Sequence, residues 1–317
     1  MKSAQCDKPK SFQLIETEIK DPADNEVVIK MEGCGVCGSN LPVWEGRPWF
    51  NYPLAPGTPG HEGWGRIEQT GKMVRNFSKN DRVAVLSSNA FAEYETVSED
   101  HIVKLPSHIN SIPFPGEPLG CAINVFKRCE IRPGQKVAVI GAGFLGNIII
   151  QLAVKKGAEV SVISKRKFSL EMAQRYGAKE CFELKSKEKT ISEINSSSSR
   201  DGFDCVIEAT GYQESLDLAG EIIKNRGRLI IAGYHQDGMR MINLQQWNWK
   251  GIDVINAHER EHSIYLQGIH EAVDAIVSQE IDILPLFTHV FAIDNINIAF
   301  ELLKNRPEGF IKALVTL

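Results

Sequence analysis

The chain has 317 residues, of which 43% are hydrophobic and 24% charged, with a formal net charge of −4. This length allows two ordinary domains with sizeable cores, and the weakly acidic balance argues against a nucleic-acid partner. The first residues lack a signal-peptide run, and no segment reaches the roughly 18 uncharged apolar residues of a membrane span, so we expect a cytoplasmic protein with no membrane partner. The seven cysteines, an odd number scattered along the chain, predict reduced thiols or metal ligands and no disulfide framework.

The N-terminal third of the sequence is typical of β-structure. Short β-like runs at 26–31, 64–69, 82–86 and 92–97 are broken by Gly, Pro and Asn. These runs predict a mostly antiparallel sheet. Three prolines then interrupt the chain between residues 112 and 118, and the pattern of apolar residues changes after them.

Beyond residue 133 the pattern alternates between strands and helices. Strands are predicted at 137–140, 159–164, 203–210, 228–233 and 252–257, and helices at 146–156, 169–177, 213–225 and 264–279. The Ser-rich stretch 186–202 predicts a helix flanked by a mobile loop, and the end of the chain predicts a strand from 287, a helix at 295–305 and a last strand. The fold class is therefore α/β, with a doubly wound parallel sheet and a mostly antiparallel β domain.

A glycine loop follows the first strand of the alternating part. Gly141, Gly143 and Gly146 form G-x-G-x-x-G between that strand and the next helix, with Phe144 and Leu145 inside the motif. The first glycine allows a tight turn, the second lets the backbone approach a pyrophosphate, and the third lets helix and strand pack closely. Three glycines alone also fit a structural turn, but this context predicts a dinucleotide site.

The second strand of this unit ends without the usual carboxylate. In its place stand Ser164, Lys165 and Arg166, and a basic cluster attracts a 2′-phosphate where an Asp would repel it. We therefore expect NADP(H) in preference to NAD(H), although a solvated basic turn would have the same sequence. Thr210 and Gly233, at the ends of two later strands, complete the predicted cofactor-binding set.

Three residues at chain breaks in the N-terminal part are candidate metal ligands. Cys37, His61 and Glu117 offer a thiolate, an imidazole and a carboxylate, all acceptable to zinc, and three protein ligands with an open position are the catalytic arrangement. Their wide spacing forms no local motif, so a buried Cys, a surface His and a loop Glu are the alternative interpretation.

The sequence resembles the zinc-containing medium-chain alcohol dehydrogenase family, and within it the polyol (sorbitol-type) dehydrogenase branch. The resemblance covers nearly the whole chain and rests on segments that occur in the family's order. These are GCGVCGS at 33–39, PGHEG at 59–63, DRVA at 81–84, FAEY at 91–94, EPL at 117–119 and the glycine loop.

The resemblance implies a site and a domain organisation. Cys37, His61 and Glu117 would hold a catalytic zinc, Glu62 would lie behind the ligands or replace one of them, and Ser39 would relay the alcohol proton. The fold would combine a GroES-like domain of residues 1–121 and 286–317 with a Rossmann domain of residues 122–285. The substrate would be a small secondary alcohol, polyol or sugar-like compound or its ketone, and the chain would form a homodimer or homotetramer.

The sequence departs from the family in three places. Residues 86–91 run straight through the position of the four-cysteine lobe of other members, so we expect one zinc and no structural zinc. Asn40 stands where the family has an aspartate, and Pro42 where some relatives have a relay histidine. Both changes put the surroundings of the ligands and the proton path in question.

Aromatic residues are candidates for the substrate site. Trp44, Trp49 and Phe91 suit the wall of a polyol site, yet they equally fit core packing or a subunit contact. His258, at a strand end, is a further candidate. The remaining histidines are predicted to be ordinary residues: His101, His108, His235, His262, His270 and His289.

Two other functions remain open at this point. A zinc-free medium-chain quinone or enone reductase would keep the glycine loop but lack the Cys, His and Glu set. A non-catalytic NADPH-binding sensor would bind the dinucleotide on the same fold without turnover.

Overall fold

The computed structural model describes residues 1–236 and 238–317, which form two compact units. The first unit consists of Met1–Gly120, Ile269–Val277 and Ile283–Leu317, and the second of Cys121–Gly268 and Ser278–Asp282. The predicted Rossmann domain includes residues 269–277, which form the second half of a helix that begins at His262. In the structure this half of the helix belongs to the first unit. There Ile269 is fully buried and lies beside Gly116.

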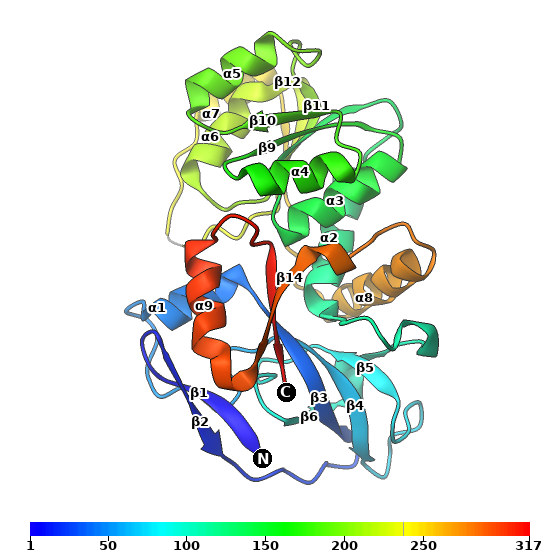
Figure 1. Cartoon of the computed structure of the whole chain (residues 1–317). Coiled ribbons are helices and arrows are strands. Elements are labelled where there is room, and N and C mark those ends of the chain that lie inside the picture. The colour runs from blue at the N-terminus through cyan, green and yellow to red at the C-terminus, as the bar shows by residue number, and fades with distance from the viewer. Residues whose placement is uncertain (237) are drawn as a thin grey trace. The chain divides into compact units, whose positions relative to one another are not determined.

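A mainly antiparallel sheet forms the centre of the first unit (Figure 1). Its strand order is β14-β15-β3-β4-β5-β7, with β6 also paired to β3, and only β14 and β15 run parallel among these described strands. The bounds are β3 Glu26–Val36, β4 Glu62–Thr70, β5 Arg82–Val85, β6 Tyr94–Ser98, β7 Ile102–Lys104, β14 Phe287–Ala292 and β15 Lys312–Thr316. The C-terminal strand thus completes the sheet that the N-terminal segment begins, as the family resemblance implies.

Helices and a hairpin cover this sheet. The hairpin consists of β1 Lys2–Lys8 and β2 Ser11–Glu16, and the helices are α1 Leu41–Glu45, α9 Ile296–Asn305 and the first part of α2 Gly116–Cys129. Short 3₁₀ turns occupy Gly38–Asn40, Glu99–His101, Ser107–Ile109, Leu284–Leu286 and Ile293–Asn295. Phe12, Trp44, Phe91 and Phe300 form an aromatic cluster in the core, with ring centroids 4.8 to 6.3 Å apart for four of their pairs.

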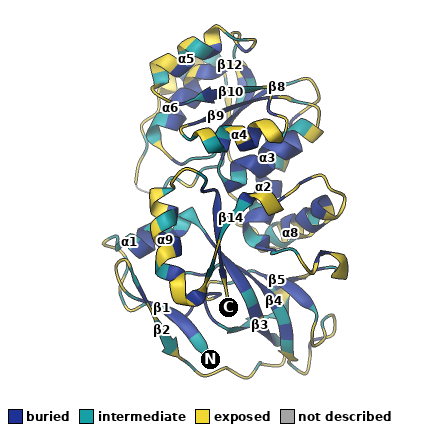
Figure 2. Ribbon diagram, viewed as in Figure 1, coloured by how far each residue is buried: buried dark blue, intermediate teal, exposed yellow. Residues whose placement is uncertain are grey.

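The second unit is built on a parallel sheet with the strand order β10-β9-β8-β11-β12-β13. Its strands are β8 Lys136–Ile140, β9 Glu159–Ser164, β10 Glu180–Glu183, β11 Phe203–Glu208, β12 Ile223–Ile231 and β13 Asp253–Asn256. The helices are α3 Phe144–Lys155, α4 Lys167–Arg175, α5 Lys187–Asn195, α6 Gln213–Ile222, α7 Leu244–Lys250 and α8 His262–Val277, the last shared with the first unit. Figure 2 shows buried strands between helices whose outer faces are exposed. The predicted doubly wound sheet is confirmed.

Some elements differ from the sequence-based expectation. The hairpin β1–β2, the helix α2, the short strands β7 and β10 and the helix α7 were not predicted. In α2 the proline at position 118 was interpreted as a break, but it lies in the first turn, where a missing N–H costs nothing. The helix expected to reach residue 225 ends at Ile222, because β12 begins at the next residue. Within the described part of the chain, every helix is too short or too polar to span a bilayer.

Candidate functional site

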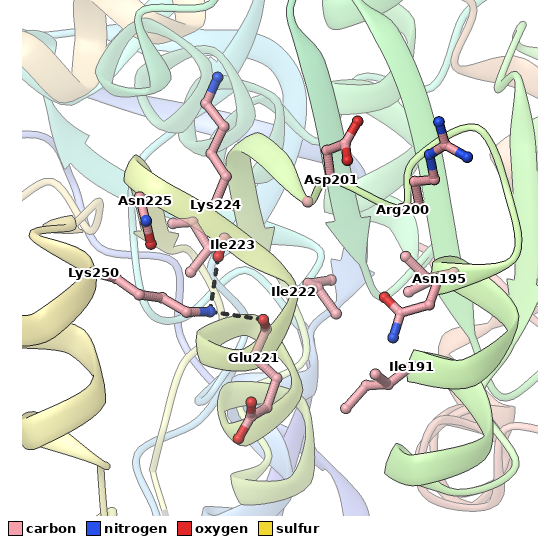
Figure 3. A pocket seen from close by; sticks show the side chains of 12 residues that line it. Ile191, Asn195, Arg200, Asp201, Glu221, Ile222, Ile223, Lys224, Asn225 and Lys250 are labelled. Carbon is pink, nitrogen blue, oxygen red and sulfur yellow. Dashed lines mark hydrogen bonds between the residues drawn. The ribbon is translucent and has the colours of Figure 1, made fainter.

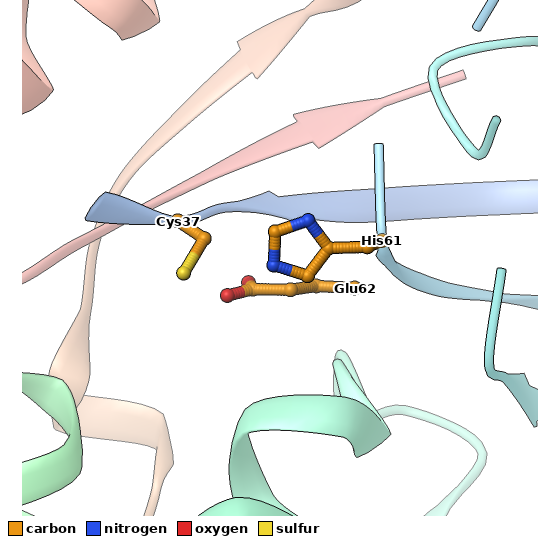
Figure 4. Close-up of side chains that lie close together, drawn as sticks. All are labelled: Cys37, His61 and Glu62. Atoms are coloured by element: carbon orange, nitrogen blue, oxygen red, sulfur yellow. The ribbon is translucent and has the colours of Figure 1, made fainter. Parts of the chain in front are cut away.

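Three side chains converge in the first unit to form a candidate metal centre. Cys37 Sγ, a ring nitrogen of His61 and a carboxylate oxygen of Glu62 lie within 4.8 Å of one another. Figure 4 shows the thiol, the imidazole and the carboxylate directed toward one another. A thiolate, an imidazole and a carboxylate so close together form a donor set of the kind that zinc binds.

Two neighbouring strands place these residues. Cys37 follows directly after β3, and Glu62 is the first residue of β4, where it pairs with Gly35 across the antiparallel ladder. A Cβ at Gly35 would lie 1.9 Å from Glu62 Oε2, so the absence of a side chain there makes room for the carboxylate. The pairing of β3 with β4 therefore brings the thiol close to both the imidazole and the carboxylate.

Hydrogen bonds orient the imidazole toward the cluster. His61 Nδ1 lies 3.1 Å from the carbonyl oxygen of Pro59 and donates to it, which leaves Nε2 free to act as a ligand. Ser39 Oγ donates to Cys37 Sγ at 3.2 Å and lies 3.5 Å from His61 Nε2. The hydroxyl predicted to relay a proton thus touches both candidate ligands.

The charges around the cluster favour a cation. Burial alone would lower the pKa of His61, but the hydrogen bond and charge of Cys37, followed by the charges of Glu117 and Glu62, raise it to about 10. Glu62 is fully buried and its carboxylate pairs with the ammonium of Lys312 at 2.5 to 2.6 Å. Burial lowers the pKa of Lys312, whereas Glu62 and then Cys37 raise it, with a net increase. The raised pKa of His61 reflects the negative charge of its surroundings, which a divalent cation bound there would neutralise.

Glu117 lies in the first turn of α2 and is half-buried. Its charge acts on His61 and Lys312, yet the carboxylate within 4.8 Å of both Cys37 and His61 belongs to Glu62. Asn40, beside the cluster in sequence, is buried, and its side-chain nitrogen has no hydrogen-bond partner. Two carboxylates thus lie near the thiolate and imidazole, and Lys312 is a partner that the sequence did not predict.

The predicted substrate residues divide into two groups. Trp44 and Phe91 are at most 1% exposed and pack in the aromatic core cluster, so the structure gives them a packing role and corrects their prediction as substrate contacts. Trp49 is 61% exposed and lies beside Phe50. His258 is exposed in the second unit, where its ring lies near that of Tyr234.

The glycine loop has the geometry expected of a phosphate-binding turn. Gly141 has a φ of +104°, and a Cβ at Gly146 would lie 2.0 Å from the carbonyl oxygen of Gly141. A Cβ at Gly143 would meet no atom within 4 Å, so open space lies over the N-terminus of α3, which starts at Phe144 and continues through Leu145. Asn147 donates two hydrogen bonds to the carbonyls of the loop and holds it closed. Backbone N–H groups and open space at a helix N-terminus suit a pyrophosphate.

The end of β9 carries the predicted basic cluster. Ser164 is buried, Lys165 is exposed, and Arg166 precedes the first turn of α4. The ammonium of Lys165 forms an ion pair with Glu214 at 2.6 Å. The ammonium of this lysine is therefore paired with a carboxylate.

A buried carboxylate organises the ends of β11 and β12. Glu208 is fully buried and accepts hydrogen bonds from the backbone N–H and hydroxyl of Thr210 and from the N–H of Gly211. A Cβ at Gly233 would lie 2.6 Å from its carboxylate. His235 also lies 3.0 Å from this carboxylate. Glu208 was not predicted from the sequence and His235 was predicted to be an ordinary residue, although Glu208 is an acidic residue that ends an apolar strand.

A cavity of about 520 Å³ lies at the amino ends of strands β11 and β12 of the parallel sheet (Figure 3). It borders the first residues of β12 and the loop before β11, whereas the glycine loop follows the last residue of β8. Lys250 donates three hydrogen bonds there, to the carbonyls of Gly220, Glu221 and Ile223 at 2.8 to 2.9 Å. The lysine thus satisfies the last carbonyls of α6, and this cavity is distinct from the dinucleotide loop.

Comparisons with known proteins match both parts of the chain. The family model described as an alcohol dehydrogenase GroES-like domain matches residues 23–107, and the model described as a zinc-binding dehydrogenase matches residues 145–274. Together they cover more than half of the 317 residues.

Several characterised proteins are similar over almost their full length. The 2-dehydro-3-deoxy-L-galactonate 5-dehydrogenase of Pseudoalteromonas atlantica is 25% identical over 99% of this chain and 98% of that protein. D-arabinitol dehydrogenase 1 of Uromyces fabae is 24% identical over 96% of this chain and 95% of its own. The crystal structure of galactitol-1-phosphate dehydrogenase from Escherichia coli has a TM-score of 0.85 at 22% identity and covers 100% of both chains. The galactitol-1-phosphate dehydrogenase therefore shares the fold described above.

Proposed function

The chain belongs to the zinc-binding alcohol dehydrogenase family, and from this premise we propose that it transfers a hydride between NADP(H), in preference to NAD(H), and a small polyol or sugar-like secondary alcohol. As a member of this family it is an NAD(P)-dependent oxidoreductase acting on alcohols. The convergence of Cys37, His61 and Glu62 is the observation that carries the proposal. The names of the relatives, dehydrogenases of a sugar acid and of a pentitol, favour a polyhydroxylated substrate.

Cys37 and His61 would hold the zinc together with one of two carboxylates. Glu117 is the ligand that the family resemblance implies, and Glu62 is the nearer carboxylate, already paired with Lys312. The chemistry that zinc supplies at such a site is Lewis acidity, which lowers the pKa of a substrate hydroxyl toward neutrality.

The protein's own residues would then handle the proton. Ser39 would accept the hydroxyl proton, and the position of its Oγ, within 3.5 Å of Cys37 Sγ and His61 Nε2, supports this role. The bond from His61 to the Pro59 carbonyl keeps the ring in one orientation while this happens. The nicotinamide cofactor supplies the hydride chemistry, and the glycine loop would anchor its pyrophosphate.

The cofactor preference and the zinc count are parts of the same proposal. Lys165 and Arg166 at the end of β9 support NADP(H), because no carboxylate ends that strand. One zinc per chain is proposed because residues 86–93, between β5 and β6, contain no cysteine. The seven free cysteines fit a reducing compartment, which supports a cytoplasmic location.

Metal analysis with matched cysteine variants tests the metal centre. The wild-type protein should hold about one zinc per chain, and Cys37→Ala should lose the zinc and the activity with it. Cys181→Ala, which removes an exposed cysteine in the other unit, should retain both. Zinc bound equally well by Cys37→Ala would contradict the proposed centre. Glu117→Gln and Glu62→Gln, compared in the same way, should identify the third ligand.

A substrate panel tests the reaction. Polyols, sugars and secondary alcohols should be assayed with both cofactors on zinc-loaded protein, and NADP(H) should give the higher kcat/KM. Turnover of a quinone or enone without zinc would indicate a zinc-free reductase instead. Dinucleotide binding without turnover of any of these compounds would indicate a sensor.

We also propose that the chain forms a homo-oligomer. The second unit exposes apolar side chains between β12 and β13, among them Met239, Met241, Leu244 and Trp249, which are 65 to 100% exposed. The edge strand β13 lies next to them in sequence, and exposed apolar side chains and an unpaired strand edge are both typical of a protein interface. Light scattering should give a molar mass that is a multiple of the 35.3 kDa of one chain. The substitution Trp249→Glu should lower this mass, whereas Trp49→Glu should leave it unchanged. A wild-type mass of one chain would contradict the proposal.

A further inference from the structure

The ion pair between Lys165 and Glu214 spans the end of a strand. Lys165 follows β9 and Glu214 lies in the first turn of α6, just after β11, and β8 lies between these two strands in the sheet. Neighbouring strands are about 4.8 Å apart, so the pair bridges roughly 10 Å across the end of β8. The glycine loop begins at that same end, with Gly141.

This position coincides with the adenosine end of a dinucleotide site. In doubly wound sheets the ligand binds outside the carboxyl ends of the strands, and the ribose 2′ position lies at the end of the second strand, here β9. A 2′-phosphate would need the ammonium of Lys165. The carboxylate of Glu214 holds that ammonium at 2.6 Å.

We propose that Glu214 is a cofactor-specificity residue. Its carboxylate competes with the 2′-phosphate of NADP(H) for Lys165 and so reduces the preference for NADP(H) over NAD(H). The inference rests on the proposed dinucleotide function and deepens it. Binding of NADP(H) requires the lysine to leave a carboxylate, and it brings a phosphate close to that same negative charge. Binding of NAD(H) requires neither change. The position of Glu214 thus makes the basic cluster less selective than its sequence suggests.

The ion pair is exposed enough for Lys165 to exchange the carboxylate of Glu214 for another anion. The side chains of Lys165 and Glu214 are 64% and 39% exposed, and solvent-exposed ion pairs are worth little individually. The two partners can therefore separate when a stronger anion arrives. A phosphate dianion is such an anion, because it carries more charge than a carboxylate.

Direct binding measurements on the full-length protein test the proposal without activity. The dissociation constants of NADPH and NADH should be measured by fluorescence titration for the wild type, Glu214→Gln and Glu214→Asp. Glu214→Gln should raise the NADH-to-NADPH ratio of dissociation constants about fivefold, mainly through tighter NADPH binding. Glu214→Asp, which keeps the charge, should return most of the wild-type ratio.

A second ion pair on the same strand gives a matched control. Glu159 begins β9, at the opposite end from Lys165, and pairs with Lys179 at 3.0 Å with a comparable exposure. Glu159→Gln should therefore leave the ratio unchanged. Lys165→Met should weaken NADPH binding, and its effect should be larger in the Glu214→Gln background, because the lysine is then free to contact the phosphate.

The outcomes separate this inference from the proposed function. An NADH-to-NADPH ratio that stays within twofold in Glu214→Gln overturns the specificity role while the dinucleotide function stands. A loss of affinity for both dinucleotides in Glu214→Gln overturns it as well, because the carboxylate would then be a general binding group. Failure of the wild type to bind either dinucleotide contradicts the proposed function itself.

Discussion

At the scale of single residues, the first unit contains an acidic group that the proposed chemistry does not use. Glu95 on β6 is 7% exposed and accepts a hydrogen bond from Ser87 at 2.7 Å. Burial raises its pKa from 4.5 to about 7, although the bonds from Ser87 and from the backbone of Asn89 oppose the shift. The folded protein therefore holds a proton that the unfolded chain releases above pH 4.5.

This proton makes stability depend on pH in a defined direction. Because the folded pKa is raised, the contribution of Glu95 is fully present below pH 4.5 and is lost as the pH rises through about 7. Glu95→Gln, a neutral mimic of the protonated acid, should become more stable relative to wild type as pH rises, by about 3 kcal/mol in total. Urea unfolding between pH 4.5 and 8 measures this difference. A difference between Glu95→Gln and wild type that does not change with pH would contradict the raised pKa of Glu95.

A second residue-scale prediction concerns His235. Arg240 Nε donates to its Nδ1 at 3.0 Å, so Nε2 carries the hydrogen that is donated to Glu208, also at 3.0 Å. This chain of bonds steadies the carboxylate that holds Thr210 and Gly211. His235 is therefore a positioning residue for the strand ends that border the cofactor loop.

Replacing His235 should weaken cofactor binding without changing its selectivity. His235→Leu leaves a buried carboxylate with one donor fewer, which should raise the dissociation constants of NADPH and NADH together by about tenfold. His235→Gln keeps an N–H donor and should recover most of the affinity. Fluorescence titration measures both values, and unchanged binding in His235→Leu would mean that the bond has no positioning role. Nitrogen NMR shifts of the ring check the tautomer independently.

The role of a residue was predictable from the sequence where its neighbours in the chain form a recognisable segment. Cys37 and His61 stand in Gly-rich segments at strand ends, and both reach the cluster. Lys312 is separated by 250 positions from its partner Glu62, so only the pairing of β15 with β3 reveals the contact. Trp44 and Phe91 were candidates for both a substrate wall and core packing, because aromatic composition alone does not distinguish the two.

At the scale of elements, the glycine loop makes a prediction with an internal comparison. A Cβ at Gly143 meets no atom within 4 Å, so Gly143→Ala should cost the folded protein at most about 1 kcal/mol, mainly through a poorer helix N-cap. The methyl group would project into the open space proposed for the pyrophosphate. Gly143→Ala should therefore bind NADPH at least about tenfold more weakly while its unfolding transition stays close to wild type.

Gly146→Ala should behave in the opposite way. Its Cβ would lie 2.0 Å from the carbonyl oxygen of Gly141, so the helix α3 must shift away from β8. Overpacking of this kind costs about 1 to 3 kcal/mol, which should appear as a lower unfolding midpoint. Equal stability losses in the two variants would contradict the assignment of separate roles to these glycines.

The elements also show where periodicity is informative. The buried strands β8, β9 and β11 and the helix α3 were predicted because apolar runs and a glycine loop mark their limits. β10 and β7 have only four and three residues, too few to establish a period. The hairpin β1–β2 turns at Lys10, which has a φ of +61° and gives no glycine signal.

At the scale of the whole molecule, the two proposed ligands belong to different units. The cluster of Cys37, His61 and Glu62 lies in the first unit and the glycine loop in the second, and each unit has a separate hydrophobic core. A ligand that binds only the folded state stabilises it by mass action, by about 2.7 kcal/mol at one hundred times its dissociation constant. The stabilisation should be concentrated in the unit that holds the ligand, because local opening there exposes the site.

Hydrogen exchange followed by mass spectrometry can locate these two effects. Removal of zinc by a chelator should speed amide exchange in peptides from the end of β3 and the start of β4, because Cys37, His61 and Glu62 would then face one another without a divalent cation. Addition of NADPH should slow exchange in peptides covering β8 and the start of α3, where the loop N–H groups would bind phosphate. Cys37→Ala should abolish the chelator effect and leave the NADPH effect intact. A chelator effect confined to peptides of the second unit would place the metal elsewhere and remove the physical basis for assigning the alcohol chemistry to the Cys37 cluster.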